Sequence, residues 1–367
     1  MTPEPVTLRL FLSVLVVLLV IAPDLIARGR PSAATLLNAT LPALALLMPH
    51  GALAYGLLAL ATGAHAYQAR PAGLQAAAMM LVAAVALALG AAALLLAGPS
   101  ALAFYMSILA LILRAGLLGL HGGMSALWRK LPALQVQQYT TLLVLVFSHL
   151  RFSDHATALA AADAIVILGA SSALIFGLTS LVQRNLDGLL RASMLMHGGL
   201  MIAATGAAGK GHAVAALFVS LSMTLAVVGL CLMVLALEAR VGKVTLLRPG
   251  GRARAFPRLA AAFGFFGAAG VGMPGTAGFI ADDLILHALW SESVYATIAV
   301  ALASALLAIA TLRAITLCFM GPQTGSVAPD LLPAERLFAF GLVLLLLVSG
   351  LTPQLVVGAA VGLFGNN

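Results

Sequence analysis

The sequence GMPGTAGFIADDLILHALW, residues 272–290, joins a run of glycine and proline to two adjacent aspartates. Proline removes a backbone donor and glycine tolerates non-helical geometry, so we expect a helix to break near Met273. Asp282 and Asp283 follow that break in an otherwise apolar sequence. Broken backbone at membrane depth is tolerated where it is buried in protein or lines a watery cavity. The residues expected to form the break are Gly272, Pro274, Gly275 and Gly278.

The composition places this stretch in a membrane protein. Hydrophobic residues make up 62% of the chain and charged residues 8%, and the mean hydropathy is +1.11. A soluble domain carries roughly 25% charged residues, so the composition indicates an integral membrane protein. The first apolar run, 6–22, lacks a basic flank and a clear A-x-A-like cleavage site. We therefore expect it to be a retained helix rather than a cleaved signal peptide.

Membrane spans are placed by length, since a helix needs about 20 residues to cross the hydrocarbon core. The stretch between Arg30 and Arg70 would make one helix of about 58 Å. That is nearly twice the hydrocarbon thickness, so we expect a hairpin that turns at residues 49–51. The other expected spans are 6–22, 73–97, 100–120, 134–150, 157–182, 189–208, 212–238, 259–287, 293–320 and 335–362.

Basic residues orient these spans. With twelve spans, only Arg9, Arg151 and Lys210 lie near one side, and the other cations share the opposite side. The positive-inside rule then predicts both termini on the non-cytoplasmic side, whereas eleven spans separate the cations less well. We expect the inner (plasma) membrane of a bacterium. The cations of the predicted inner side are Arg28, Arg30, Arg70, Arg129, Lys130, Arg184, Arg191 and those of the run 240–258.

The expected fold class is an all-α integral membrane protein with about 12 transmembrane helices. Residues 1–120 form N-terminal helices, and residues 121–237 and 259–367 form the two parts of a core, the second containing the broken helix at 272–278. Between them, residues 238–258 form a basic cytoplasmic loop that is too short to fold alone.

The basic loop has two interpretations. It can lie against anionic lipid headgroups, or it can dock an acidic cytoplasmic partner. The net charge of +8 follows mainly from membrane topology, so we expect no nucleic-acid partner. The candidate docking residues are Arg240, Lys243, Arg248, Arg252, Arg254 and Arg258.

The sequence does not indicate a binding site for a cofactor or a metal. Gly270 to Gly275 fit the pattern G-x-G-x-x-G, but the dinucleotide fingerprint requires a soluble βαβ unit. Cys231 and Cys318 lie in separate apolar spans without a metal-ligand spacing. We therefore expect no metal site, no cofactor and no catalytic site for redox chemistry in this chain itself.

Three ionisable residues follow the predicted break. Asp283 and His287 are four residues apart and share a helix face, and Asp282 is adjacent. A carboxylate can hold an imidazole in this arrangement, so the cluster could pass a proton along. The alternative is an interfacial or structural polar group near the outer end of the span.

Other ionisable residues within the spans are functional candidates, because charge inside a membrane is rare. Arg114 and Arg313 can pair with acids or extend to the cytoplasmic headgroups, and Asp163 can complement the positive end of a helix. For a lone histidine near a helix end, a hydrogen-bonded packing role is the alternative to proton transfer. The histidine candidates are His121, His149 and His197.

Five segments, in order, resemble the proton-translocating subunits of respiratory complex I and Mrp-type cation/proton antiporters. GMPGTAGFIADDLIL is similar to the family's Gly-Leu-Pro-Gly-Thr-x-Gly-Phe followed by an acid or lysine and Leu-Ile-Leu. LLGLHGGMSALW resembles its Pro-Phe-His-x-Trp-Leu-Pro segment, and LVQRNLDGLLRASMLMHGG its Asp-Leu-Lys-Arg-Leu-Leu-Ala-Tyr-Ser-Ser-x-x-His-x-Gly. LRAITLCFMGP and DLLPAERLFAFGLVLLLLVSGLTPQ resemble its last helices. The likeness covers residues 110–355.

This resemblance implies antiporter-like inverted repeats with broken helices and a polar axis through the membrane plane. It implies a proton path coupled to other membrane subunits. His197 falls on the family histidine, His121 on the histidine of the Phe-His-x-Trp segment, and Asp282 and Asp283 on the acid or lysine after Gly-Phe.

The sequence departs from the family in its charged residues. No lysine occurs between Lys130 and Lys210, where the lysine of the first broken helix belongs. Glu4 is the only glutamate before Glu238, so the acid that partners this lysine is also missing. The chain is a shortened, lysine-poor member by this resemblance, about two helices shorter than usual.

Three functions are consistent with these observations. The first is a proton-conducting subunit with a reduced path through the aspartates and histidines. The second is a non-conducting scaffold that anchors partner proteins. The third, by family analogy, is the membrane half of a proton-driven complex that accumulates inorganic carbon, with a cytoplasmic partner at 238–258.

Overall fold

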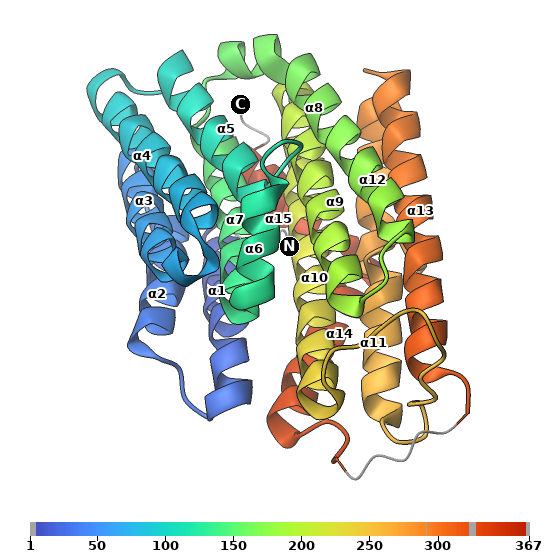
Figure 1. The fold of residues 1–367 in the computed structure, drawn as a ribbon. Helices are drawn as coiled ribbons and strands as arrows, with labels where there is room; N and C mark the ends of the chain where they lie inside the picture. The colour runs from blue at the N-terminus through green and yellow to red at the C-terminus, as the bar shows by residue number, and fades with distance from the viewer. Residues whose placement is uncertain (1–4, 291, 323–327, 365–367) are drawn as a thin grey trace.

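A computed structural model describes residues 5–290, 292–322 and 328–364. Within these residues the regular secondary structure is helical, apart from one isolated bridge between Asn185 and Thr245 (Figure 1). The helices are α1 Pro5–Arg28, α2 Ala33–Leu47, α3 Gly51–Gln68, α4 Leu74–Ala97, α5 Ala101–Ala115, α6 His121–Lys130, α7 Pro132–Phe152, α8 His155–Leu181, α9 Leu186–Ala207, α10 Ala213–Val241, α11 Pro257–Ala269, α12 Ala277–Trp290, α13 Val294–Phe319, α14 Pro333–Leu351 and α15 Pro353–Phe364.

Six stretches of the described residues are long and apolar enough to cross a membrane, judged by length and composition. The longest, Leu186–Val241, consists of two helices, because Lys210 and Gly211 leave helical geometry between them. The thiol of Cys231 lies 3.8 Å from the sulfur of Met194. Since Met194 precedes the turn at 208–212 and Cys231 follows it, this contact shows that α10 runs back along α9.

The chain turns between α2 and α3 and is interrupted between α11 and α12, and Gly278 lies inside α12 rather than in the interruption. α2 ends at Leu47 and α3 begins at Gly51, which confirms a turn at 49–51. The predicted span 259–287 is divided into α11 and α12 by residues 270–276. Figure 1 shows these two helices in succession along one crossing of the bundle.

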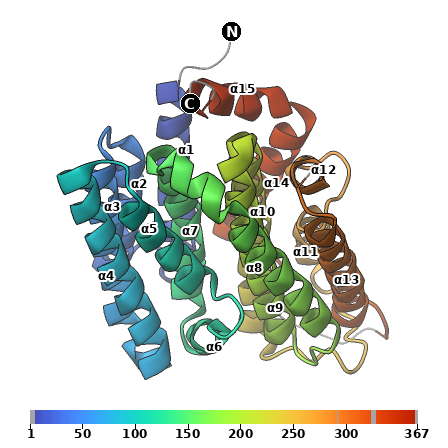
Figure 2. The same ribbon diagram turned by 90° about the horizontal axis from the view of Figure 1, so that it is seen from above.

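Two predicted spans are wrong in their extent. The span 335–362 is divided at Thr352, where Pro353 cannot donate the next helical hydrogen bond. Its second piece, α15, contacts α1 and α10 and lies across one side of the bundle in Figure 2. The span 100–120 ends at Ala115, because Gly116 takes a left-handed conformation with φ +69°. The count of about 12 crossings stays a prediction.

The basic loops gather at one end of the bundle, which we call the basic end. There, the ammonium of Lys130 donates to the carbonyl of Pro71, and the N–H of Leu246 donates to the carbonyl of Arg184. The turns at 48–50, 153–154 and 208–212 lie at the opposite end. The clustering of cations predicted from topology is therefore present, and the assignment of the basic end to the cytoplasm stays a prediction.

The bundle has two halves, which we define as α1–α7 and α8–α15. Figure 2 shows α2–α5 on one side and α11–α13 on the other, with α7, α9 and α10 between them. Helices in lipid associate mainly through close packing, which small residues permit. A Cβ atom at Gly199 would lie 2.7 Å from the backbone nitrogen of Ala173, and one at Gly198 would lie 3.0 Å from the carbonyl of Ala115. These glycines hold α9 between α8 and the first half.

Candidate functional site

The break between α11 and α12 is built by glycine and proline. Gly272 and Gly275 have φ +78° and +86°, a region that favours glycine. The N–H of Met273 donates to the carbonyl of Ala268, and the hydroxyl of Thr276 donates to the carbonyl of Met273. Hydrogen bonds within this turn thus replace some of the regular hydrogen bonds of an α-helix.

The ends of α11 and α12 and the neighbouring helix α14 pack closely around this break. A Cβ atom at Gly278 would lie 1.8 Å from the carbonyl oxygen of Ala269, so the two helix ends meet with no room for a side chain. On the other side, a Cβ atom at Gly350 of α14 would lie 2.2 Å from the carbonyl carbon of Thr276. Thr276 of the irregular backbone is therefore buried by protein, whereas Pro274 is exposed and the glycines beside it are half-buried.

His197 joins α9 to the break. Its Nε2 lies 2.7 Å from the carbonyl oxygen of Gly270, and its Nδ1 lies 2.7 Å from the carbonyl oxygen of Ser193. Carbonyls only accept, so an imidazolium ring satisfies both contacts, whereas a neutral ring has one N–H. The hydroxyl of Ser193, 3.3 Å from Nδ1, can donate to the neutral ring. Both protonation states therefore have hydrogen-bond partners in this site.

Asp282 turns back toward the same break from α12. A Cβ atom at Gly272 would lie 2.5 Å from its Oδ2 atom, so only glycine leaves room for this carboxyl group. The other oxygen, Oδ1, is buried and has no hydrogen-bond partner. A buried polar atom without a partner is uncommon and calls for a functional explanation. His197 and Asp282 thus reach the break from two sides, at Gly270 and Gly272.

Asp283 and His287 point away from the break. Their side chains are 59% and 81% exposed, and His287 Nδ1 lies 3.4 Å from Asp283 Oδ1. The expected contact between residues four apart is present on an outward face. The structure therefore separates the predicted acidic cluster, and only Asp282 lies at the break.

The first half buries Arg114 of α5. This side chain is 1% exposed, and its guanidinium donates to the hydroxyl of Thr62 at 2.8 Å and to the carbonyl of Gln138 at 3.0 Å. No ion pair within the described part of the chain includes it. His65 of α3 is also 1% exposed, and neither of its ring nitrogens has a hydrogen-bond partner. Arg114 is thus a buried cation without a counter-ion.

A chain of buried polar groups continues from this region toward the basic end. The hydroxyl of Thr35 donates to the carboxylate of Asp24 at 2.6 Å, and the amide of Gln137 donates to Thr35 at 3.3 Å. Asn38 then donates to the side-chain oxygens of Gln137 and Gln68, each at 3.0 Å. These contacts tie α1, α2, α3 and α7 together by neutral hydrogen bonds and one carboxylate.

The remaining histidine and arginine candidates lie apart from both regions. His149 Nδ1 is 2.7 Å from the hydroxyl of Ser107 at the opposite end of α7. His121 is exposed, with its ring 5.5 Å from that of Phe176. Arg313 donates to the carbonyls of Leu181, Gln183 and Leu246, which closes the end of α8 without an acid partner.

Asp163 belongs to an ion-pair cluster at the opposite end. Lys210, in the turn between α9 and α10, lies 2.8 Å from Asp163 Oδ1 and 2.5 Å from Glu292 Oε2. Hydrogen bonds to Asp163 and then to Glu292 raise the pKa of Lys210 above its ordinary value. This cluster fixes the end of α12 against the α9–α10 turn.

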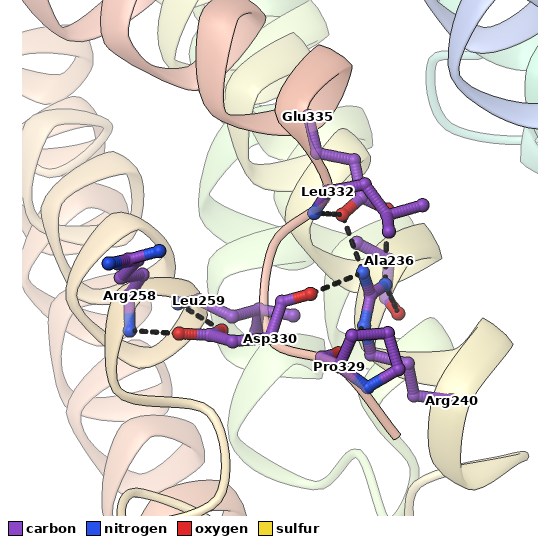
Figure 3. A network of polar contacts seen from close by, with 8 residues as sticks. All are labelled: Ala236, Arg240, Arg258, Leu259, Pro329, Asp330, Leu332 and Glu335. Carbon is purple, nitrogen blue, oxygen red and sulfur yellow. Dashed lines mark hydrogen bonds and ion pairs between the residues drawn. The ribbon is translucent and has the colours of Figure 1, made fainter. Parts of the chain in front are cut away.

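The basic loop begins with an arginine that is held within the chain (Figure 3). Arg240 and Glu335 pair at 2.6 Å, with side chains 7% and 4% exposed. Arg240 also donates to the carbonyls of Ala236, Pro329 and Asp330. Its hydrogen-bonding capacity is therefore used inside the protein rather than displayed for a partner.

The same cluster fixes the start of the broken helix. The carboxylate of Asp330 accepts from the backbone N–H groups of Arg258 and Leu259, at the first turn of α11. Side chains that remain exposed in the loop are those of Lys243, Arg248, Arg254 and Arg258.

Sequence reasoning missed His65, Gln138 and Glu335. His65 lies in an apolar helix with no motif around it. Gln138 accepts from Arg114 through its backbone carbonyl and donates from its side-chain amide to the carbonyl of Arg114. Glu335 had a usable signal, since an acid at the third position of a helix reaches back to the residue before it; its carboxylate accepts from the N–H of Leu332 at 2.7 Å.

Comparison with known proteins identifies relatives of the whole bundle. A family model described as NADH:quinone oxidoreductase/Mrp antiporter, TM, matches residues 44–308. A search of the curated proteins finds no match.

Solved structures of several membrane complexes contain chains with this fold. A chain of respiratory complex I from Thermus thermophilus with bound NADH superposes with a TM-score of 0.84 and 22% identity, covering 96% of this chain and 84% of that one. A chain of the Mrp complex from Dietzia sp. DQ12-45-1b gives 0.82 and 18%, covering 99% and 84%. A chain of the archaeal membrane-bound sulfane sulfur reductase gives 0.82 and 16%, covering 96% and 65%. Because the sequence identities are only 16–22%, these matches show that the chains share a fold.

Proposed function

Because the chain belongs to the NADH:quinone oxidoreductase/Mrp antiporter transmembrane family, we propose that it translocates protons as a membrane subunit of a multi-subunit complex. The single observation that carries this proposal is the meeting of His197 and Asp282 at the break between α11 and α12. Both side chains can bind and release a proton, and both are held by backbone that departs from helical geometry.

The proposed step is a proton transfer across the break. The imidazolium of His197 gives up the proton of its Nε2–H, and the carboxylate of Asp282 accepts a proton at Oδ1 by way of water. After the transfer, the Nδ1–H of the neutral ring still donates to the carbonyl of Ser193, and the carboxylic acid of Asp282 is uncharged. The transfer therefore removes one pair of opposite charges from low-dielectric surroundings, where isolated charge is costly.

Coupling to partners is part of the proposal. A charge or conformational change in a neighbouring subunit alters the relative energies of the two protonation states. We expect the basic end to face the cytoplasm of a bacterial cell, where Arg248 and Arg254 are available for lipid headgroups or a cytoplasmic partner. The outward pair of Asp283 and His287 is available to an adjacent membrane subunit.

Proton flux in sealed liposomes tests this function. Asp282→Asn keeps the side-chain shape and removes the titrating group, and we expect it to abolish dissipation of an imposed pH gradient. Asp283→Asn is the matched control on the next position of the same helix, and we expect its flux to equal that of the wild type. Equal flux in all three proteins would contradict the assignment to Asp282.

A second candidate function is a scaffold that anchors other subunits without conducting protons. Arg114 favours it, because a buried guanidinium remains protonated and takes no part in proton transfer. If the scaffold is the correct function, purified wild-type protein shows no flux, and Asp282→Asn leaves the activity of the complete host complex unchanged.

A further inference from the structure

A cavity of about 540 Å³ opens between the two halves at the opposite end of the bundle from the basic loops. One wall comes from the end of α7 and the start of α8, and the other from the α9–α10 turn. We propose that this cavity binds the phosphate group of an anionic ligand. Its titratable lining residues are His149, Arg151 and His155.

The charge of the lining favours an anion. No aspartate or glutamate is among the residues that line the cavity. The nearest acid in sequence, Asp154, directs its carboxylate to the backbone N–H and hydroxyl of Thr157 in the first turn of α8. That carboxylate also interacts with His155, whereas Arg151 belongs to none of the ion pairs among the described residues, so an anion entering the cavity meets the positive charge of Arg151.

The guanidinium of Arg151 is held in a fixed position. Its NH1 group donates to the carbonyl of Met48 at 2.7 Å, and the guanidinium stacks over the ring of Phe152 at 4.7 Å. An arginine carries five N–H donors in a rigid fork that suits phosphate oxygens. Since one donor group is occupied by Met48, the remaining donors can serve a ligand.

A second arginine adds to the positive field. Arg9 of α1 lies close enough to Arg151 to repel it, and its Nε atom is buried without a hydrogen-bond partner. Two arginines held together in a partly buried position destabilise the fold unless an anion lies near them. A bound phosphate group removes this repulsion.

The start of a helix and the histidines around the cavity also favour an anion. The first residue of α10, Ala213, lines it, so the positive end of that helix faces the cavity, whereas the carboxylate of Asp154 already caps the start of α8. His149 is 3% exposed and uses only its Nδ1 in the contact with Ser107, at 2.7 Å. The volume exceeds that of one phosphate group, which leaves room for a free ion with its waters or a lipid headgroup.

Titration with sodium phosphate tests the site. Full-length protein in a neutral detergent is titrated by calorimetry, with sodium chloride at matched ionic strength as the reference. We expect phosphate binding that is about tenfold weaker in Arg151→Gln, because a charge-assisted hydrogen bond is lost. His155→Gln, on an exposed position that is safe for folding, should also weaken it, whereas Arg129→Gln at the basic end should not.

A parallel titration with phosphatidylglycerol in mixed micelles identifies the source of the phosphate group. Binding of free phosphate supports a site for a soluble anion, and binding of the lipid alone supports a headgroup site; both require sensitivity to His155→Gln. The proposal is overturned if neither ligand binds, or if both bind equally well to wild type, Arg151→Gln and His155→Gln.

Discussion

Each half of the molecule holds, inside the bundle, an ionisable side chain with no ion pair among the described residues; the one in the first half is buried, the one in the second is half-buried, and their charges have opposite sign. The first half contains Arg114, held by Thr62 and Gln138. The second half contains Asp282, whose Oδ1 has no partner at the helix break. A histidine accompanies each of them, His65 in the first half and His197 in the second.

This difference separates a fixed charge from a titratable one. A guanidinium remains protonated at physiological pH, so Arg114 contributes a constant positive field to the first half. A carboxyl group and an imidazole change charge, so the second half can carry a proton. Under the proposed function, the first half contributes a constant positive charge and the second half contributes the side chains that bind and release the proton.

The largest expected effect contrasts two buried arginines. Arg240→Met leaves the carboxylate of Glu335 buried without its cation, and we expect a loss of about 3–5 kcal/mol of stability. Arg114→Met removes a charge that has no counter-ion, so the lost hydrogen bonds are largely offset and the change should stay within about 1 kcal/mol. Thermal unfolding in one detergent measures both.

A large loss of stability in Arg114→Met would contradict this comparison, because it would mean that the first half does provide compensation for the charge. A negligible loss in Arg240→Met would show that the pair with Glu335 is not maintained in solution.

Two glycines of the break provide the next contrast. Gly272→Ala and Gly275→Ala both place a side chain at positive φ, which costs about 1 kcal/mol in each. Only the new methyl group at Gly272 meets Asp282, at 2.5 Å from Oδ2, whereas nothing lies within 4 Å at Gly275. We therefore expect Gly272→Ala to lose most of its proton flux and Gly275→Ala to keep it.

Liposome assays at equal protein incorporation measure this pair. Circular dichroism of each variant checks that the helices are intact. Equal loss of flux in both variants would attribute the effect to backbone strain and would remove the argument for the position of Asp282.

Local chemistry explains which features could be predicted from the sequence. Proline and glycine at the break, and the turn at 49–51, act through short-range backbone geometry, so their positions were predictable. The orientation of Asp282 and Asp283 was not, because adjacent helical residues point about 100° apart and the packing of α9 and α14 selects which one is inward. The isolation of Arg114 also depends on packing, since its partners come from α3 and α7.

The smallest expected effect concerns the cluster that holds α12 at the opposite end. The pKa of Lys210 is raised by Asp163 and Glu292. This pairing therefore stabilises the fold at pH values below the ordinary lysine value of 10.5, and the contribution is lost as the pH rises through the raised value. Because Asp163 is 72% exposed, we expect Lys210→Met to cost less than about 1 kcal/mol.

Unfolding temperatures of wild type and Lys210→Met at about pH 8 and about pH 11.5 measure this contribution, with the difference expected to shrink at the higher pH. A difference that is the same at both pH values would assign the effect of the substitution to packing instead of charge.

The most direct measurement compares the two buried histidines. His197 and His65 are both 1% exposed, one in each half, so His197→Asn and His65→Asn are matched variants for proton flux in sealed liposomes. We predict that His197→Asn abolishes flux and that His65→Asn retains it, because only His197 reaches the helix break beside Asp282. Retained flux in His197→Asn together with lost flux in His65→Asn would contradict the assignment of proton transfer to the second half.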